Sequence, residues 1–135
     1  MIRIQGIKHE FIKFPVGEPH VKLDLRVGQI PEAVVTFKFE RSEEIVELLL
    51  ICDALKRADK LLYRLEMDYV PFGRQDRVAV EGEAFSLKVF CDLINGLGFE
   101  KVSILDPHSD VTTALINNVE VMPQEDIFLK TYEEV

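Results

Sequence analysis

The N-terminal part of the chain alternates apolar and polar residues with a period of two. In HVKLDLRVG, the apolar residues from Val21 to Val27 point to one side and the charged residues between them point to the other. Weaker versions of this alternation run through residues 2–7 and 9–14. The pattern predicts half-exposed strands, two of which pair as a hairpin at the front of the chain.

The pattern changes at residue 33, where denser apolar segments with strand and helix periods begin to alternate. We expect strands at residues 33–39, 61–67, 101–105 and 119–122, and helices that follow Ser42, span residues 84–97 and begin at Asp110. Ser42 is a favourable N-cap, and Gly98 stands where helices usually end. This order predicts an α/β fold: a three-layer αβα domain with a mostly parallel sheet, plus an N-terminal antiparallel strand pair. Such sheets bind ligands beyond the carboxyl ends of their strands.

The helix expected at residues 84–97 has two apolar stripes. The stripe that suits packing against a sheet consists of Leu87, Phe90, Cys91, Ile94 and Leu97. A second line, formed by Phe85, Val89 and Leu93, indicates that the helix is covered on another side as well. Its cover is either a loop of the same chain or a neighbouring subunit.

Length and charge narrow the classes of function. The chain has 135 residues, of which 47% are hydrophobic, so it suits one domain with a buried core. A net charge of −8 argues against a nucleic-acid or anionic-membrane binder, because both need a positive field. No apolar run approaches the ~18–20 residues of a membrane span, and the start of the chain lacks the apolar segment of a signal peptide. We therefore expect a cytoplasmic protein in which Cys52 and Cys91 are buried free thiols.

A polar cluster, GRQDR, follows the strand expected at residues 61–67. Arg74 carries a planar fork of donors that suits phosphate, and Gln75 offers a donor and an acceptor that suit the edge of a base. Asp76 is placed to orient Arg74 or Arg77. The alternative is a solvated loop held by its own ion pairs, and spacing alone leaves both interpretations open.

A second cluster, DPHSD, follows the strand expected at residues 101–105. The proline stiffens the segment and biases Asp106 toward an extended backbone. A carboxylate at Asp106 and an imidazole at His108 can then share a divalent ion or its bound water. The alternative is a helix-capping turn with Ser109 or Asp110 as the cap.

A third short stretch, FPVGEPH, lies between the N-terminal strands. Gly17 permits a tight turn, and Glu18 follows it. Phe14 is either part of the core or an exposed ring available for stacking, and composition does not decide between the two.

The order and spacing of these clusters resemble the N-terminal half of the ribose-phosphate diphosphokinase, or phosphoribosyl pyrophosphate synthetase, family. The family pattern reads F-x-[DN]-G-E, then a strand and a helix, then [FY]-x-R-Q-D-R, a mobile loop, a helix and D-x-H-[AS]. The matching residues are Phe14, Gly17 and Glu18; Phe72, Arg74, Gln75, Asp76 and Arg77; and Asp106, His108 and Ser109. The resemblance runs from about Phe14 to Asn118 and implies a phosphoribosyltransferase-like fold.

The resemblance implies a specific chemistry. Enzymes of the family move the β,γ-diphosphoryl group of Mg-ATP to the 1-hydroxyl of ribose 5-phosphate. The residues implied to bind ATP are Phe14, Glu18, Arg74, Gln75, Asp76 and Arg77, and those implied to help hold magnesium are Asp106 and His108. Phe14 and Glu18 would approach the adenine from a neighbouring subunit, and residues 77–82 would form a mobile loop that reaches across subunits. The chain is thus expected to form a homo-oligomer with shared nucleotide sites.

The chain departs from the family pattern in two places. Val16 stands where the family has Asp or Asn, and a valine cannot hydrogen-bond an adenine edge. The second α/β domain, with its ribose-5-phosphate loop and catalytic lysine loop, does not follow. We therefore expect residues 1–135 to be an N-terminal domain that binds ATP and magnesium, contains no catalytic residue and is inactive alone. The alternatives are a non-catalytic nucleotide-binding or regulatory subunit and, less well matched, a generic α/β nucleotide binder.

Overall fold

The chain is described by a computed structural model that places residues 1–26, 30–107 and 110–122. Its elements are β1 (Ile2–Ile4), β2 (Lys8–Lys13), β3 (Pro19–Asp24), β4 (Glu32–Phe37), α1 (Glu43–Arg57), β5 (Leu61–Tyr69), α2 (Ser86–Leu97), β6 (Lys101–Asp106), α3 (Asp110–Leu115) and β7 (Val119–Val121). No helix within these ranges is long and apolar enough to cross a membrane.

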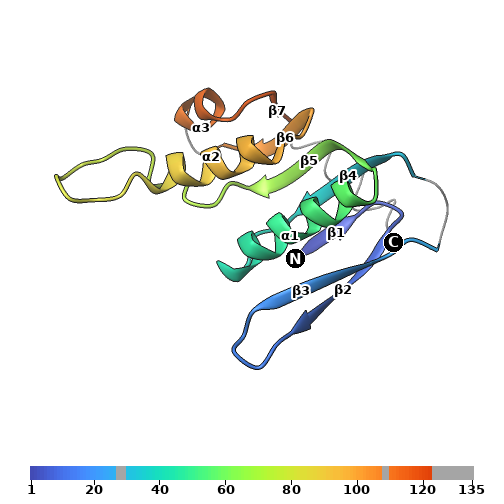
Figure 1. Cartoon of the computed structure of the whole chain (residues 1–135). Coiled ribbons are helices and arrows are strands. Elements are labelled where there is room, and N and C mark those ends of the chain that lie inside the picture. Colours follow the sequence, from blue (N-terminus) through green and yellow to red (C-terminus); the bar gives the residue numbers. More distant parts are fainter. Residues whose placement is uncertain (27–29, 108–109, 123–135) are drawn as a thin grey trace.

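Five strands form the main sheet in the order β1-β4-β5-β6-β7 (Figure 1). The strands β4, β5, β6 and β7 are parallel, whereas β1 pairs antiparallel with β4 at the edge. β2 and β3 form a separate antiparallel hairpin. The predicted fold class is therefore confirmed as an α/β domain with a mostly parallel sheet and an antiparallel strand pair.

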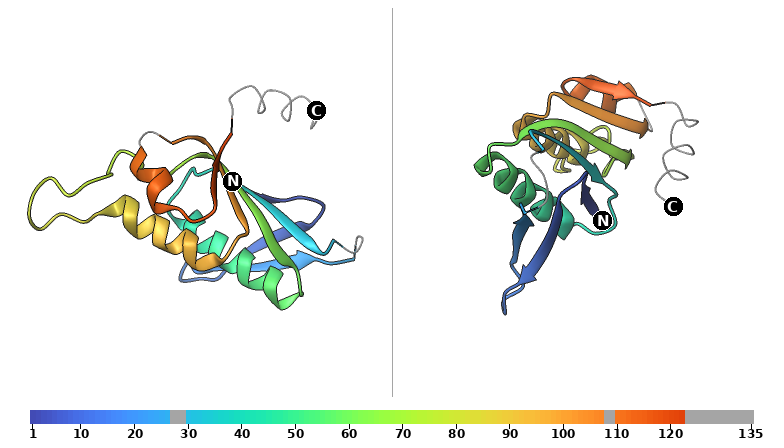
Figure 2. Two further views of the ribbon diagram at one scale, coloured as in Figure 1. Left: turned by 90° about the horizontal axis from the view of Figure 1, so that it is seen from above. Right: turned by 90° about the vertical axis from the view of Figure 1, so that its right-hand side faces the viewer.

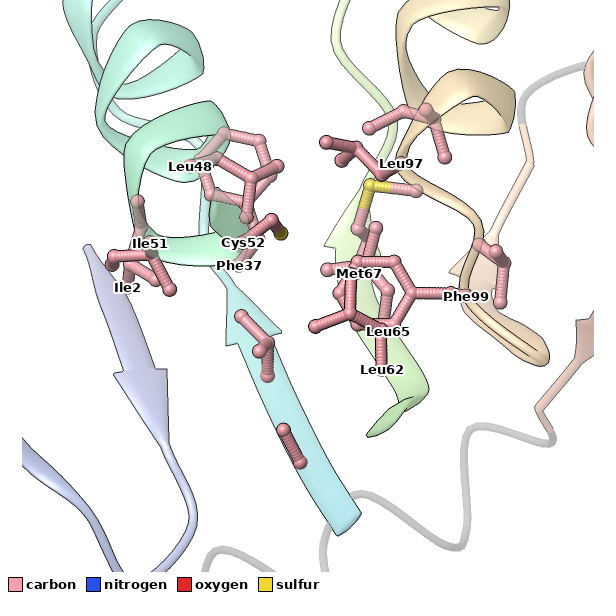
Figure 3. Close-up of a cluster of buried hydrophobic side chains, with 14 of the residues drawn as sticks. Ile2, Phe37, Leu48, Ile51, Cys52, Leu62, Leu65, Met67, Leu97 and Phe99 are labelled. Atoms are coloured by element: carbon pink, nitrogen blue, oxygen red, sulfur yellow. The ribbon is translucent and has the colours of Figure 1, made fainter. Parts of the chain in front are cut away.

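The helices α1 and α2 pack on the same face of the sheet, and the core lies between them and the strands (Figure 3). Alternate residues of the central strands β4 and β5 enter this core, such as Val35 and Phe37 of β4 and Leu65 and Met67 of β5. All five residues of the predicted sheet-facing stripe of α2 are buried. Right-handed crossovers between neighbouring parallel strands place successive helices on one face. A helical layer on the opposite face is not found within the described residues.

The hairpin of β2 and β3 projects from the domain beside α1 (Figures 1 and 2). Val21 of β3 is buried, and Lys13 Nζ lies 3.3 Å from Glu43 Oε2 at the start of α1. β3 ends at Asp24, earlier than the predicted strand, and Leu25 is exposed. Of the predicted strand, only its last residue, Val27, lies outside the described residues.

The buried carboxylate of Glu44, rather than the Ser42 side chain, holds the chain at the start of α1. Ser42 occupies the N-cap position, but its hydroxyl makes no capping hydrogen bond. Glu44 is 2% exposed and accepts the backbone N–H groups of Glu40 and Arg41, both at 2.7 Å. It also pairs with the amino group of Met1. Glu44 therefore fixes the loop that leads from the carboxyl end of β4 into the helix.

Replacing Glu44 with alanine should destabilise the domain. The part-buried N–H groups of Glu40 and Arg41 would lose their charged acceptor. Since a hydrogen bond to a charged group contributes about 1.5–3 kcal/mol, we expect the free energy of unfolding at pH 7 to fall by about that much. Burial alone raises the pKa of Glu44, but the amino group of Met1 and these N–H groups outweigh it and hold the pKa below its usual 4.5. The stabilisation is thus present above the usual pKa and is lost as the pH falls through the lowered one. Urea denaturation of the wild type and of Glu44→Ala, from pH 7 down through the lowered pKa, measures both the loss of stability on substitution and its disappearance in acid.

Glu47, one turn further along α1, provides a matched control. Partial burial raises the pKa of Glu47 against the attraction of Arg41, and the carboxylates of Glu44 and Glu43 add to the rise. Its ionised form is therefore disfavoured by folding, and Glu47→Ala should not lower stability at pH 7. Equal destabilisation by the two substitutions would contradict the role given to Glu44.

Cys52 and Cys91 are buried free thiols, as predicted. Burial raises the pKa of Cys52 to about 12 and that of Cys91 to about 11. Both thiols therefore stay protonated at neutral pH and serve as small apolar side chains of the core.

Candidate functional site

The polar clusters predicted after two of the strands leave the sheet at one edge. β5 and β6 are adjacent and parallel, and Tyr69 is the register partner of Asp106. The loop after β5 and the segment after β6 therefore start side by side at the carboxyl edge of the sheet. The chain also passes from β4 into α1 at this edge. In open α/β sheets this edge is where ligands bind.

Two consecutive turns carry the chain away from β5. The N–H of Gly73 donates to the carbonyl of Val70 at 3.2 Å, and the N–H of Gln75 donates to the carbonyl of Phe72 at 2.9 Å. In the first turn Pro71 is the second residue and Phe72 is the third, with a φ of 64°. This is the pattern of a type II turn, whose third position normally takes glycine. A bulky residue in this conformation costs about 1–3 kcal/mol.

The cluster at residues 74–77 is available to an external ligand. Arg74, Gln75 and Arg77 are exposed, and Asp76 is half-buried. Within the described residues, no side chain of this cluster makes an ion pair or a hydrogen bond. The alternative of a loop held by its own ion pairs is thus not supported there, and Asp76 orients neither arginine. Two guanidinium groups are left to bind an anion.

The residues predicted to hold magnesium are only partly placed. Asp106 is the last residue of β6, and its backbone alone is described, whereas His108 lies outside the described residues. No group of three His, Cys, Asp or Glu side chains in the described ranges is arranged to hold a metal ion. What the register shows is that Asp106 ends its strand beside the strand that leads to Arg74.

The third predicted cluster forms the tip of the hairpin. The N–H of Phe14 donates to the carbonyl of Glu18 at 2.9 Å, and the N–H of Gly17 donates to the carbonyl of Phe14 at 2.8 Å. Gly17 has a φ of 107°, a conformation that favours glycine. The side chain of Phe14 is 46% exposed, so it is not part of the core, and Glu18 is exposed too. Val16 is 89% exposed and presents a methyl surface without a hydrogen-bonding side-chain group.

One chain does not bring the six predicted nucleotide-binding residues together. The hairpin tip and the loop after β5 are separate projections of the domain (Figure 2). No hydrogen bond, ion pair or ring contact joins the tip to residues 74–77 in the part of the chain that the structure describes. Residues 77–82, predicted to reach another subunit, form part of this loop, and Val78 and Val80 are exposed on it.

The second apolar stripe of α2 is open over part of its length. Val89 is 59% exposed and Leu93 is 39% exposed, whereas Phe85 is half-buried. The described residues therefore do not supply the covering loop that was one of the two predicted alternatives. The other alternative, a neighbouring subunit, stays a prediction.

Two hollows in the surface lie along the hairpin rather than at residues 74–77. One, of about 550 Å³, is lined by the open ends of β2 and β3. The other, of about 430 Å³, lies between the hairpin and the start of α1. Neither of these two hollows is lined by residues 74–77.

Sequence reasoning missed two residues that shape this edge. Glu44 was expected only to suit the positive end of a helix, and it stands two residues after Ser42 instead of the three that mark a capping box. From the sequence, Phe72 is only a match to the family pattern, and no feature of the sequence predicts a positive φ at a phenylalanine. In both cases the decisive contacts are three-dimensional.

No protein-family model matches the chain. Among curated proteins, the ribose-phosphate pyrophosphokinase of Thermococcus kodakarensis is 36% identical over 106 residues, which is 76% of this chain and 36% of the relative. That of Pyrococcus abyssi is 31% identical over 106 residues, or 78% of this chain and 36% of the relative. That of Oceanobacillus iheyensis is 36% identical over 98 residues, or 72% of this chain and 31% of the relative. The chain thus spans about a third of the length of these relatives.

Among solved structures, the phosphoribosylpyrophosphate synthetase from Mycobacterium smegmatis has a similar fold. The TM-score is 0.75, and the likeness covers 94% of this chain and 43% of that chain at 23% identity. This likeness supports the fold, and the curated relatives support the family. Pyrophosphokinase is another name for diphosphokinase, so the predicted resemblance to this family is confirmed. Over about three quarters of its length, this chain is a homologue of the ribose-phosphate pyrophosphokinases.

Proposed function

We propose that this chain is the N-terminal, ATP- and magnesium-binding domain of a ribose-phosphate pyrophosphokinase. The proposal rests on the loop after β5 in a chain that is homologous to these enzymes. The arginines of this loop form no ion pair with other described residues and are therefore available to a ligand. In this role the chain holds ATP, while a C-terminal domain holds ribose 5-phosphate.

In the proposed reaction, the 1-hydroxyl oxygen of ribose 5-phosphate forms a bond to the β-phosphorus of ATP. The bond from this phosphorus to the oxygen that bridges to the α-phosphorus breaks, AMP leaves, and the hydroxyl proton is released. Phosphoryl transfer of this kind depends mainly on positioning and on neutralising charge. Arg74 suits the second task, because its planar fork can donate to two phosphate oxygens at once. Gln75 follows with an amide that both donates and accepts.

The donor set at the end of β6 fits a magnesium ion that is shared with the nucleotide. Mg²⁺ prefers oxygen ligands and is usually bound by one or two protein groups together with substrate phosphates and water. Asp106 offers a carboxylate at the edge that also carries Arg74, and His108 offers a further ligand in the sequence. The bound ion would supply additional positive charge next to the phosphates. Because two protein ligands are too few to hold it alone, the ion should bind here together with ATP.

The remaining predicted nucleotide contacts are proposed to come from a second copy of the chain. The exposed ring of Phe14 suits stacking on adenine, and Glu18 lies at the same hairpin tip. Since the tip and residues 74–77 do not meet within one chain, a homo-oligomer would complete the site. The exposed side chains of Val89 and Leu93 on α2 support such an association.

Replacing Arg74 with alanine tests the nucleotide site directly. The substitution removes a charge-assisted contact worth about 1.5–3 kcal/mol, so we expect the affinity for Mg-ATP to fall roughly ten- to hundredfold. Isothermal titration calorimetry measures this change. The thermal stability should stay close to that of the wild type, because Arg74 is exposed and makes no ion pair or side-chain hydrogen bond in the described part of the chain.

Arg57→Ala is the matched control for this substitution. Arg57 is also exposed, but it lies at the end of α1, at the opposite edge of the sheet. Its Nε is 2.8 Å from Asp53 Oδ2. Its loss should leave the affinity for ATP unchanged. The proposed function would be rejected if wild-type protein bound no nucleotide, or if the two substitutions weakened binding equally.

A further inference from the structure

We infer that Phe72 is a positioning residue, whose ring fixes the turn that presents Arg74 to a nucleotide. The inference rests on the proposed function, because Arg74 is the group that Phe72 would position. Neither the family resemblance nor the comparisons give Phe72 such a role. Three features of the described residues support it: the contacts of the ring, the conformation of the backbone and the hydrogen bonds of the turns.

The ring of Phe72 joins three segments that meet at the carboxyl edge of the sheet. Its centroid lies 6.3 Å from that of Phe39, which follows β4, and 6.1 Å from that of Phe90 in α2. Phe39 in turn lies 6.1 Å from Phe37 in the core. Tilted aromatic pairs at these separations are favourable beyond the area that they bury. The ring thus extends the rigid core outward to the loop.

The backbone of Phe72 adopts a conformation that needs such an anchor. A φ of 64° is rare for a bulky side chain, and the third position of this turn suits glycine far better. A phenylalanine keeps this unfavourable conformation only where its surroundings hold it. The contacts with Phe39 and Phe90 supply that constraint.

The hydrogen bonds of the loop pass this constraint on to Arg74. Arg74 is the third residue of the second turn, which begins at Phe72 and closes with the N–H of Gln75 on the Phe72 carbonyl, at 2.9 Å. The carbonyl of Gln75 accepts the N–H of Leu87 in α2, at 3.3 Å. Because no other side chain in the described ranges holds Arg74, the direction of its guanidinium depends on this backbone. Without the ring, the backbone can relax toward negative φ and turn Arg74 away.

Phe72→Leu and Phe72→Tyr test the inference in the full 135-residue chain. Leucine keeps the position apolar but removes the ring, and we expect its affinity for Mg-ATP to fall by at least about tenfold, because Arg74 is no longer preorganised. Tyrosine keeps the ring and should retain the wild-type affinity. Amide hydrogen exchange supplies a readout that does not depend on ATP. Exchange at Gln75 and Leu87 should accelerate in Phe72→Leu and stay unchanged in Phe72→Tyr.

Phe99→Leu is the control for a general loss of packing. Phe99 is buried in the core just before β6, at the amino edge of the sheet, and it is far from the loop. The control should lower the melting temperature yet leave both the ATP affinity and the exchange at Gln75 unchanged. If Phe72→Leu does not fold, Phe39→Leu replaces it, because this variant removes one of the two ring contacts.

The outcomes separate this inference from the proposed function. If wild-type protein binds no ATP, the proposed function fails, and the exchange at Gln75 and Leu87 still decides whether the ring holds the turn. If Phe72→Leu binds ATP as tightly as the wild type, Phe72 is not a positioning residue. The same conclusion follows if Phe99→Leu weakens ATP binding as much as Phe72→Leu does.

Discussion

Supplied with Mg-ATP and ribose 5-phosphate, the 135-residue chain alone should release no measurable AMP. The chain spans about a third of the length of its curated relatives. We propose that it contributes only the nucleotide side of the reaction. Because the sugar is proposed to bind a C-terminal domain, these 135 residues alone would leave the two substrates to meet by diffusion. Holding two reactants in register contributes an effective concentration of about 10⁵–10⁸ M, so its loss removes turnover by many orders of magnitude.

A coupled assay of AMP formation, with calorimetry on the same sample, measures this expectation. Binding of ATP without turnover is the expected result, and it distinguishes a nucleotide-binding domain from an unfolded chain. The full-length ribose-phosphate pyrophosphokinase of Thermococcus kodakarensis, which the chain matches at 36% identity, provides the positive control. Turnover by the isolated chain in the usual enzyme range of ~1–10³ s⁻¹ would overturn the expectation.

The parts of the fold that depend on local periodicity could be predicted from the sequence. β4, β5 and β6 begin and end within two residues of the predicted strands, and they are parallel as the alternation of periods required. All residues of the predicted sheet-facing stripe of α2 are buried. This could be predicted because apolar residues that recur with a period of 3.6 mark the side of a helix that packs against the sheet. The helix ends at Leu97 and is capped by Gly98, whose φ of 81° is the left-handed conformation that glycine favours.

Features that depend on contacts between residues far apart in the sequence could not be predicted from periodicity. The alternation predicted strands at residues 2–7, 9–14 and 21–27 but not which two of them form the hairpin. In the structure β1 leaves the hairpin to β2 and β3 and pairs with β4 in the main sheet. The start of α1 relies on Glu44, whose two backbone donors and amino-terminal partner become neighbours only in the folded chain. Such contacts depend on tertiary structure and leave no periodic signal in the sequence.

The candidate site, too, could be predicted from the sequence only in part. The sequence placed polar clusters after two strands, and the topology of parallel strands then required both to start from one edge, as Tyr69 and Asp106 show. The conformation of the loop before Arg74 depends on the aromatic contacts of Phe72 with other elements, which no spacing reveals. The position of Phe14 relative to Arg74 depends on a second chain, if the proposed association is correct.

Mixing two variants that each bind nucleotide weakly should restore tight binding if the site is shared between chains. Phe14→Ala removes the hairpin ring and Arg74→Ala removes the guanidinium, so each variant alone should bind Mg-ATP roughly ten- to hundredfold more weakly. In a symmetric dimer, each site would combine the hairpin tip of one protomer with residues 74–77 of its partner. A mixed dimer would then contain one site with both defects and one site with none.

The size of the expected recovery in ATP binding can be calculated. Random exchange gives mixed dimers in about half of the population, each with one intact site of two, so about a quarter of all sites should regain wild-type affinity. Calorimetry or equilibrium dialysis measures this fraction at an ATP concentration between the dissociation constants of the intact and the damaged sites. Nucleotide should also shift the association equilibrium toward the dimer, since a ligand that needs two chains stabilises their complex by mass action.

A mixture of Phe14→Ala with Glu18→Ala is the matched control, because both substitutions lie on the hairpin tip. In the shared-site arrangement, every site of such a mixed dimer keeps one damaged tip, so no wild-type site should form. Substituting Val89 on the exposed stripe of α2 with glutamate should weaken the association itself, because it places a charge on the apolar surface proposed to meet the partner. The shared-site model is wrong if the Phe14 and Arg74 variants exchange subunits without regaining affinity, or if the protein binds ATP at full affinity as a monomer.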